Sequence, residues 1–357
     1  MFASTVGINI TLSRPSNSGA LRQHLMHSHA MLTTHTEGEE IGNMRMGLAI
    51  DASCDLPQDF LQQHDIAVMP IAVKVDKTIF KDDRNPAEIE RFLKLDLGSR
   101  SHSAETEPCS VDDVQKLFLD KLVLEKDCVF CLTITAGRSA IYDNVVKASF
   151  GVLKNYRKVR EPAGITGPFL MRVLDTRSLF VGSAPCVVEA VRLIQANETP
   201  AAIRERLAYI AENSYGYMLP RDLYYLRARA KKKGDRSVGL LTAVLGSTLD
   251  IKPLLRGYRG ETTPVGKVRG WEHGCETLFN YAANRVRAGL LVPVMCTAYG
   301  GDLSELPKLP GYQQLADACQ ECGVTLMQAP MSITGMVNVG EGAVTIGFAA
   351  EEHQVEF

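Results

Sequence analysis

Three strand-like segments of this sequence end in side chains that can form hydrogen bonds. They are Asp51 and Ser53 after residues 48–50, Thr133 and Thr135 at the end of residues 129–135, and Asp175 and Thr176 after residues 172–174. Ligands of open parallel sheets bind beyond the carboxyl ends of the strands. Hydroxyls and carboxylates at such an edge can hold a polar head group. They can also serve a hydrolase or phosphotransferase that uses Asp51, Thr135 and Asp175, and this alternative stays open.

Signatures of the commoner catalytic and nucleotide-binding sites are absent from the sequence. No Gly-x-Gly-x-x-Gly opens a helix after the first strand, and neither a Gly-Lys-Ser/Thr phosphate loop nor a Gly-x-Ser-x-Gly is present. The histidines after residue 45 lie in no motif that supplies an orienting partner; they are His64, His102, His273 and His353. The sequence therefore predicts a binding protein that is not an enzyme and needs no cofactor.

The 9 cysteines favour structural roles in a reducing cytosol, because they are scattered through a chain too long to be a disulfide-stapled domain. Cys128 and Cys131 lie in a run that predicts a buried strand, where their odd spacing points the sulfurs to opposite faces. Cys319 and Cys322 share a helix face, but no further ligand lies near them in the sequence to complete a zinc set. We expect a cytoplasmic protein without a metal site.

Charge and composition exclude several classes of protein. The 39 Lys+Arg and 41 Asp+Glu residues give a net charge of -2, which argues against a nucleic-acid binder. Hydrophobic residues make up 45% of the chain, enough for a sizeable core. No apolar run reaches the roughly 18 residues that membrane insertion needs. We interpret the basic run at residues 227–234 as a solvated helix face or loop.

Strand and helix patterns alternate from residue 46, which predicts a doubly wound, mostly parallel sheet. Ser110 followed by Asp113 signals the start of a helix. Pro70, inside the strand-like residues 66–75, indicates an edge strand or a bend. Apolar or capping patterns predict further helices at residues 141–152, 181–194 and 200–212.

The sequence predicts an extension followed by two domains. Residues 1–45 lack periodicity and are rich in Ser, Thr, His and Gly, so we expect a disordered or loosely ordered extension. Met44 or Met46 is then the expected natural start. Residues 46–216 are expected to form one α/β domain and residues 217–357 a second, with a ligand cleft between them. The second domain has expected strands near residues 251, 265, 291–296 and 343–348, and expected helices at 272–286 and 312–322.

Several short segments follow one another in a recognisable order from residue 46 onward. They are Asp51-Ala-Ser-Cys-Asp-Leu-Pro57, Ile66-Ala-Val-Met-Pro-Ile71, Thr135-Ala-Gly-Arg-Ser-Ala-Ile-Tyr142, Val173-Leu-Asp-Thr-Arg-Ser178, Lys233-Gly-Asp-Arg236, Leu249-Asp-Ile-Lys-Pro-Leu254 and Gly266-Lys-Val-Arg-Gly270. This succession resembles the DegV family of bacterial fatty-acid-binding proteins. The resemblance implies a two-domain α/β protein that buries one acyl chain and presents its carboxyl group to a separate fatty-acid kinase.

The resemblance also implies which residues contact a long-chain fatty acid or related lipid. Carried over by position, they are Thr106, Thr135, Ser139, Arg236, Arg269 and Asn338. The first three would donate hydroxyl hydrogen bonds, the arginines would be cationic or partner-facing, and Asn338 stands where the family has a histidine. Each buried acyl methylene contributes about 0.8 kcal/mol, so such a site needs no catalytic group.

Two departures from the family pattern bear on the head group. Glu105 and Glu107 flank Thr106 and would repel a bound carboxylate if they faced it. Asn338 can donate a hydrogen bond but cannot carry charge or shuttle a proton. These changes leave open an uncharged head group, and also a diverged regulatory protein that has lost its ligand.

Overall fold

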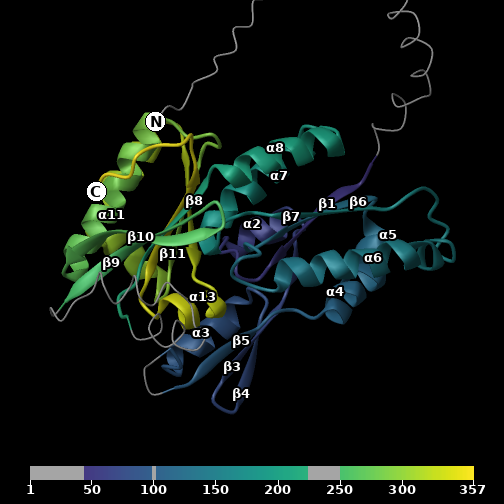
Figure 1. The fold of residues 1–357 in the computed structure, drawn as a ribbon, viewed down its shortest axis with the longest axis horizontal. Helices are drawn as coiled ribbons and strands as arrows, with labels where there is room; N and C mark the ends of the chain where they lie inside the picture. The colour runs from purple at the N-terminus through teal and green to yellow at the C-terminus, as the bar shows by residue number, and fades with distance from the viewer. Residues whose placement is uncertain (1–43, 99–101, 224–249) are drawn as a thin grey trace, which may run out of the picture. The chain divides into compact units, whose positions relative to one another are not determined.

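The computed structural model of the chain describes residues 44–98, 102–223 and 250–357, which contain three β-sheets (Figure 1). Most of the expected N-terminal extension, the basic run at residues 227–234 and the candidate residue Arg236 lie outside the described residues.

The four-stranded sheet is parallel, as predicted. Its strands have the order β2-β1-β6-β7 and comprise β1 (Met46–Asp51), β2 (Ala67–Met69), β6 (Cys128–Thr133) and β7 (Leu170–Asp175). α2 (Gln58–Gln63) links β1 to β2. Helices cover both faces of this sheet (Figure 1), with α4 (Val111–Leu117), the π-helix η2 (Phe118–Leu122), α5 (Val123–Glu125) and α6 (Ile141–Arg160) on one face, and α7 (Ala184–Gln195) and α8 (Pro200–Glu212) on the other. The 3-10 helix η3 (Phe180–Ser183) precedes α7 and contacts β8 (Ser214–Leu219), β11 (Val294–Tyr299) and β13 (Val344–Ala349).

The local signals read from the sequence are confirmed. The Ser110 hydroxyl accepts a hydrogen bond from the backbone N–H of Asp113 at 3.0 Å and so caps α4. Pro70 separates edge strand β2 from β3 (Ile71–Val75), which belongs to a different sheet. A proline has no N–H for a strand ladder, so the chain changes sheets at this residue.

A small three-stranded sheet was not predicted from the sequence. It has the antiparallel order β4-β3-β5, with β4 (Thr78–Asp82) and β5 (Ala104–Glu107) on either side of β3. α3 (Pro86–Lys94) follows β4 and is capped by Asn85, whose side chain accepts from the Ala87 N–H. These strands are short and carry charged residues, so their hydrophobic alternation is weak.

The six-stranded sheet contains most of the C-terminal half. Its order is β10-β9-β8-β13-β11-β12, and only β11 and β12 run parallel. The strands are β8 (Ser214–Leu219), β9 (Ile251–Tyr258), β10 (Glu261–Arg269), β11 (Val294–Tyr299), β12 (Thr325–Pro330) and β13 (Val344–Ala349). The described helical elements of this half are α11 (Trp271–Ala288), η4 (Leu303–Lys308), α12 (Tyr312–Glu321) and α13 (Ile333–Val339). The expected second α/β region is thus present, with a mixed sheet.

Helix α7 lies between the two larger sheets. It packs on β1 of the four-stranded sheet and on β11 and β13 of the six-stranded sheet, and it is buried on nearly all sides. At the η3 end of this contact, a Cβ atom on Gly347 would lie 2.1 Å from the Val181 carbonyl oxygen, so only glycine fits there. The predicted boundary after residue 216 falls inside β8. The division into two domains stays a prediction.

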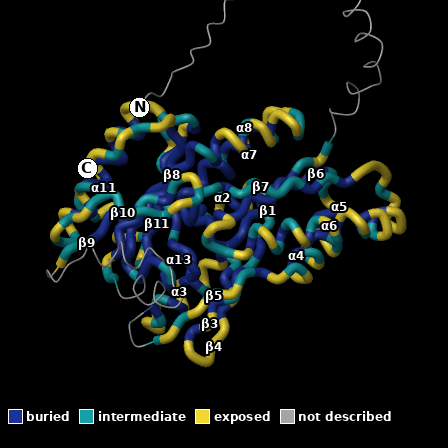
Figure 2. The backbone as a smooth tube through the Cα atoms, viewed as in Figure 1, coloured by how far each residue is buried: buried dark blue, intermediate teal, exposed yellow. Residues whose placement is uncertain are grey.

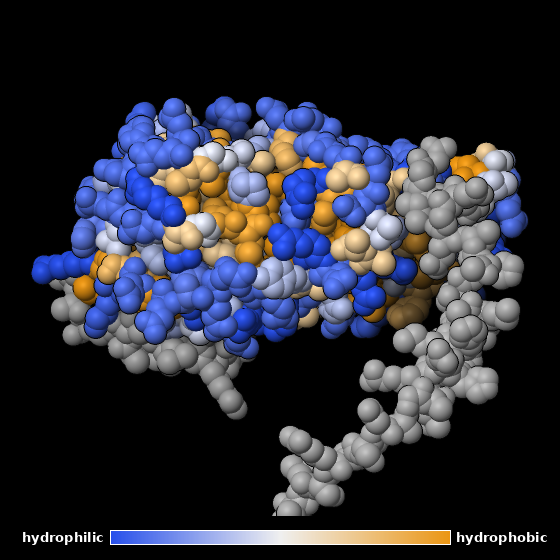
Figure 3. All heavy atoms as spheres, turned by 90° about the horizontal axis from the view of Figure 1, so that it is seen from above, coloured by the Kyte–Doolittle hydropathy of each residue, from blue (hydrophilic) through white to orange (hydrophobic). Residues whose placement is uncertain are grey.

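The core follows the strands of the two larger sheets. All six residues of β6, β8, β11 and β13 are buried. Figure 2 shows the backbone around β8 in the dark colour of buried residues. On the face seen in Figure 3, apolar side chains gather near the middle and hydrophilic ones border them. Within the described residues, no helix combines the length and apolar character needed to span a membrane.

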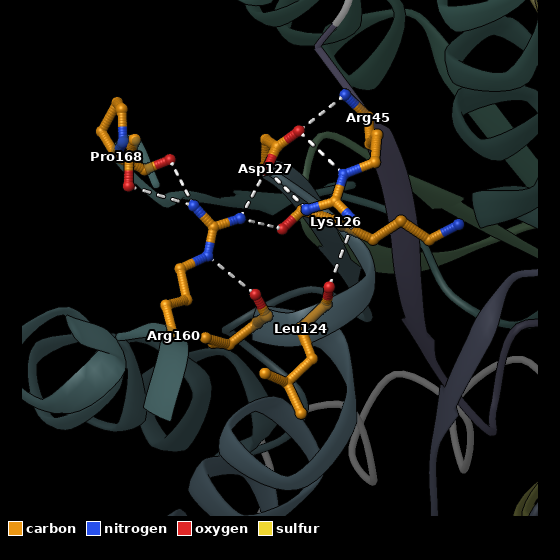
Figure 4. A network of polar contacts seen from close by, with 8 residues as sticks. Arg45, Leu124, Lys126, Asp127, Arg160 and Pro168 are labelled. Carbon is orange, nitrogen blue, oxygen red and sulfur yellow. Dashed lines mark hydrogen bonds and ion pairs between the residues drawn. The ribbon is translucent and has the colours of Figure 1, made fainter. Parts of the chain in front are cut away.

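A buried arginine fixes the C-terminal end of α6 to the four-stranded sheet (Figure 4). Arg160 is 1% exposed and donates to the carbonyl oxygens of Val123, Lys126, Gly167 and Pro168 at 2.7–3.2 Å. It also donates to Asp127 at 2.5 Å. This one side chain therefore joins the end of α6, the turn before β6 and the loop before β7.

Candidate functional site

Asp51, at the end of β1, is 1% exposed, and both oxygens of its carboxylate accept hydrogen bonds. One carboxylate oxygen accepts from the Ser53 N–H at 3.0 Å and from the Ser53 hydroxyl, and the other accepts from the Ile134 N–H at 2.6 Å. Burial raises the pKa of Asp51, and these hydrogen bonds oppose that effect. The carboxylate thus connects the turn after β1 to the turn after β6, and each of its oxygens already accepts a hydrogen bond.

Thr135 and Asp175 form the neighbouring part of this edge, and a hairpin of the six-stranded sheet covers them. Asp175 accepts from the Thr135 hydroxyl at 3.5 Å and from the Ala136 N–H at 3.1 Å. Gly260, in the β9–β10 turn, donates to the Arg177 carbonyl at 2.7 Å, and a Cβ on Gly260 would lie 3.2 Å from the Thr135 hydroxyl. Thr135 is consequently only 2% exposed.

The alternation along β5 separates Thr106 from the two acidic residues beside it. Glu105 and Glu107 are exposed, whereas Thr106 is half-buried and pairs with the fully buried Val73 of β3. Successive residues of a strand point to opposite faces of the sheet. The glutamates therefore face away from Thr106, and the expected repulsion of a carboxylate held by Thr106 is reduced.

Helix α13 packs on the face of the three-stranded sheet that carries Thr106. It contacts β3 and β5, and the Thr334 N–H donates to Asp82 of β4 at 2.8 Å. Asp82 pairs with Ile71 and Thr106 pairs with Val73, and Ile71 and Val73 are two residues apart on β3. Asp82 and Thr106 consequently share one face of the sheet.

Asn338 lies on the same helix, four residues after Thr334. Its side-chain amide donates to the Thr334 carbonyl at 2.7 Å, and the residue is half-buried. Residues four apart share one face of a helix. The structure therefore places Thr106 and Asn338 on two elements that pack against each other.

A buried ion pair lies at the N-terminal end of α13. Arg84 is 2% exposed and donates to Asp55 at 3.0 Å, to the Leu56 carbonyl at 3.2 Å and to the Pro330 carbonyl at 2.7 Å. Asp55 also accepts from the Ser332 N–H at 2.8 Å. Burial raises the pKa of Asp55 to about 6, although Arg84 acts in the opposite direction. This pair connects the turn after β1 to the segment between β12 and α13.

Four polar atoms of this junction have no hydrogen-bond partner among the described residues. They are the second carboxylate oxygens of Asp55 and Asp82, the Nε of Arg84 and the hydroxyl of Thr334, all buried. Buried polar atoms are nearly always hydrogen-bonded in folded proteins. The junction between the three-stranded sheet and α13 can therefore still accept hydrogen bonds from a small polar group and donate hydrogen bonds to it.

The other predicted ligand residues lie elsewhere. Ser139 is half-buried at the start of α6, and its hydroxyl accepts from the Ile141 N–H at 3.3 Å. Asn144, on the first turn of α6, donates to the carbonyl of Cys109 at 2.9 Å, which brings this helix end towards the end of β5. Arg269 is exposed at the far end of β10, about 25 Å along the strand from the turn that covers Thr135. Arg269 therefore lies at the other end of the β9–β10 hairpin from Thr135.

Sequence reasoning did not single out Arg84, Asp82 or Thr334. Arg84 follows the strand segment that ends in Asp82, and a lone arginine after a strand is an ordinary surface residue. The sequence feature that could have indicated a buried ion pair was Asp55 in the Asp51–Pro57 segment. An acidic side chain that is buried beside an apolar strand needs a hydrogen-bond donor. The order of residues in the sequence does not show that Arg84 is the donor that pairs with Asp55.

The parallel four-stranded sheet and the mixed six-stranded sheet, which both pack on α7, define an α/β protein with two large sheets and a small third one. The sequence profile described as "Uncharacterised protein, DegV family" matches residues 45–351. This chain belongs to the DegV family, as the succession of segments in its sequence indicated.

Relatives of known sequence agree with this assignment. A DegV domain-containing protein of Xanthomonas axonopodis pv. citri is 52% identical over 310 residues, which cover 87% of this chain and 99% of the relative. A fatty acid-binding protein of Thermotoga maritima is 25% identical over 309 residues, covering 86% of this chain and 98% of the relative.

Solved structures share the fold. A DegV lipid binding protein from Thermotoga maritima has a TM-score of 0.67 at 21% identity, covering 87% of this chain and 100% of that chain. A stearic acid-binding protein from Eubacterium ventriosum has a TM-score of 0.67 at 19% identity, covering 86% of this chain and 98% of that chain. The predicted α/β fold class is thereby confirmed.

Proposed function

We propose that this chain binds one long-chain fatty acid or related lipid, with the acyl chain buried in a cleft between the two α/β regions. Hydroxyl and amide groups near the junction of the three-stranded sheet and α13 hold the head group. The observation that carries this proposal is the position of Thr106, on the face of β5 turned towards α13 with Glu105 and Glu107 on the other face. Relatives described as fatty-acid binding support it.

The chemistry of such a site suits neutral donors. Each acyl methylene taken from water contributes about 0.8 kcal/mol, so a long chain supplies most of the affinity. The head group must keep hydrogen bonds, or its desolvation would cancel that gain. The proposed donors are Thr106 and Asn338 at this junction, together with the hydroxyls of Ser139 and Thr135.

The protein acts as a carrier rather than an enzyme in this proposal. It presents the head group to a separate fatty-acid kinase in the cytoplasm, and the exposed Arg269 contributes to the surface that meets this partner. Arg236 has the same proposed role. The hydrolase or phosphotransferase alternative has less support, because both oxygens of the Asp51 carboxylate accept hydrogen bonds from neighbouring turns.

Native mass spectrometry of protein purified from its own host tests the carrier proposal. We expect a mass increment of one acyl lipid per chain, and extraction should release a long-chain fatty acid. The measurement should be repeated after delipidation and addition of palmitate or oleate. A chain that carries no lipid and also takes up neither fatty acid would contradict the proposal.

Thr106→Val should weaken fatty-acid binding about 5- to 10-fold, because it removes one hydroxyl donor and keeps the side-chain shape. Displacement of a fluorescent fatty acid measures the effect. Thr78→Val is the matched control, since Thr78 is an exposed threonine on β4 of the same sheet. Equal affinities for Thr106→Val and Thr78→Val would remove Thr106 from the site.

A further inference from the structure

The outer face of α6 carries two large apolar side chains in water. Phe150 is 70% exposed and Leu153 is 40% exposed. Residues three apart lie side by side on a helix, so the ring of Phe150 and the branched side chain of Leu153 form one apolar strip. The other strongly exposed apolar side chains, such as Ile79 at 70%, lie on other elements. α6 is thus the described helix that carries two such residues as neighbours.

Basic side chains border this strip. Lys147, Lys154, Arg157 and Lys158 are exposed on the same face, and Asp143 is the one acidic residue within the helix. With 100° between successive residues, the lysines lie along one edge of the face and Phe150 and Leu153 along the other. No ion pair engages the three lysines among the described residues.

The helix cannot turn this face inward. Its opposite side is buried against the four-stranded sheet and α4 through Ile141, Val145, Ala148, Val152 and Tyr156. Arg160 fixes its C-terminal end through five hydrogen bonds to protein oxygens. Figure 2 shows exposed residues recurring along α6. The strip of Phe150 and Leu153 is therefore a permanent part of the surface.

Charge and shape together point to one kind of partner. An apolar strip edged by flexible lysines matches an anionic bilayer, where apolar side chains enter the boundary below the head groups and lysines stay at the lipid phosphates. Lysine and arginine both bind phosphates, lysine as a point charge, so the basic side chains of this face, Arg157 included, fit the lipid phosphates of such a surface. α4, beside α6, has both acidic and basic exposed residues, so the attraction is confined to α6 itself.

We propose that the outer face of α6, centred on Phe150 and bordered by Lys147, Lys154 and Lys158, docks the protein on anionic lipid surfaces. This surface is separate from the head-group site. Docking there would bring a carrier of acyl chains to the membrane from which such chains come. The interaction is peripheral and salt-sensitive, because a single helix face supplies both the apolar and the charged contacts.

Flotation of the full chain with lipid vesicles tests this proposal. We expect binding to vesicles of equal parts phosphatidylglycerol and phosphatidylcholine, at least 10-fold weaker binding to phosphatidylcholine alone, and loss of most binding in 0.5 M salt, where the Debye length falls to a few ångströms. Phe150→Ser with Leu153→Ser should weaken binding about 10-fold or more. Lys147→Gln with Lys154→Gln and Lys158→Gln should have a similar effect.

Matched controls keep the outcome interpretable. Ile79→Ser removes an equally exposed apolar side chain from another element, and it should bind the vesicles like the wild type. All variants should keep the wild-type melting temperature and lipid content by native mass spectrometry. Equal binding to anionic and neutral vesicles, or unchanged binding of both α6 variants, overturns the docking proposal. Normal lipid content in that case leaves the carrier function standing.

Discussion

Arg84→Met should lower the free energy of unfolding by about 3–5 kcal/mol, the usual cost of removing one partner from a buried ion pair. Arg84 is the one described cation that the structure pairs with Asp55, and both residues are at most 2% exposed. The substitution keeps the approximate length of the side chain but leaves the carboxyl group of Asp55 without its counter-ion. The Leu56 and Pro330 carbonyls also lose their donor.

Urea denaturation followed by circular dichroism measures this effect. Asp55→Asn in the Arg84→Met background should recover part of the loss, because the remaining buried group is then uncharged. Arg91→Met is the matched control, since Arg91 is an exposed arginine on α3. A loss below about 1 kcal/mol for Arg84→Met, within the range of a surface pair, would show that the buried pair does not hold the junction.

Arg84→Met should also weaken fatty-acid binding if the proposed site is correct. The pair fixes the segment from Pro330 to Ser332, and α13 with Asn338 begins directly after it. A shift of this helix would move Asn338 away from Thr106. Measuring affinity well below the denaturation midpoint separates this effect from unfolding.

Arg160→Met should be comparably destabilising, by about 3–5 kcal/mol, because it leaves Asp127 and four carbonyl oxygens without their shared donor (Figure 4). Arg157→Met provides the control on the same helix, since Arg157 is exposed. Equal unfolding midpoints for the two variants would contradict the importance of the network.

The hydrogen bonds between Arg160 and Asp127 also predict that the stability of the protein depends on pH. Burial of Asp127 by itself would raise its pKa, but hydrogen bonds from Arg45 and Arg160 outweigh it and lower the pKa to about 2. A folded-state pKa below the unfolded value near 4 gives stability that is present above about pH 4 and lost as the pH falls towards 2. Arg160→Met should reduce this loss, which unfolding curves at pH 6 and pH 3 would detect.

Elements with strong local signals were predictable from the chain alone. α8 begins at Pro200 after its Thr199 cap, and the expected range of 200–212 agrees with the structure. The α6 prediction stopped at residue 152, whereas the helix continues to Arg160, because its last turns are mostly charged and carry little apolar periodicity. The short strands β4 and β5 and the seven-residue α13 were missed because pairing partners, rather than their own residues, stabilise them.

The sequence by itself determined the parallel sheet, most helices, the family and the set of candidate polar residues for a head-group site. These features depend on the periodicity of apolar residues and on short local segments, which are visible in the order of the residues. Only the tertiary structure decided which of these polar residues contact one another. Arg84 and Pro330 are 246 positions apart, and the burial that makes their contact necessary exists only in the folded protein. The opposite orientations of Thr106 and its flanking glutamates likewise depend on β5 pairing with β3, since strand register decides which face is buried.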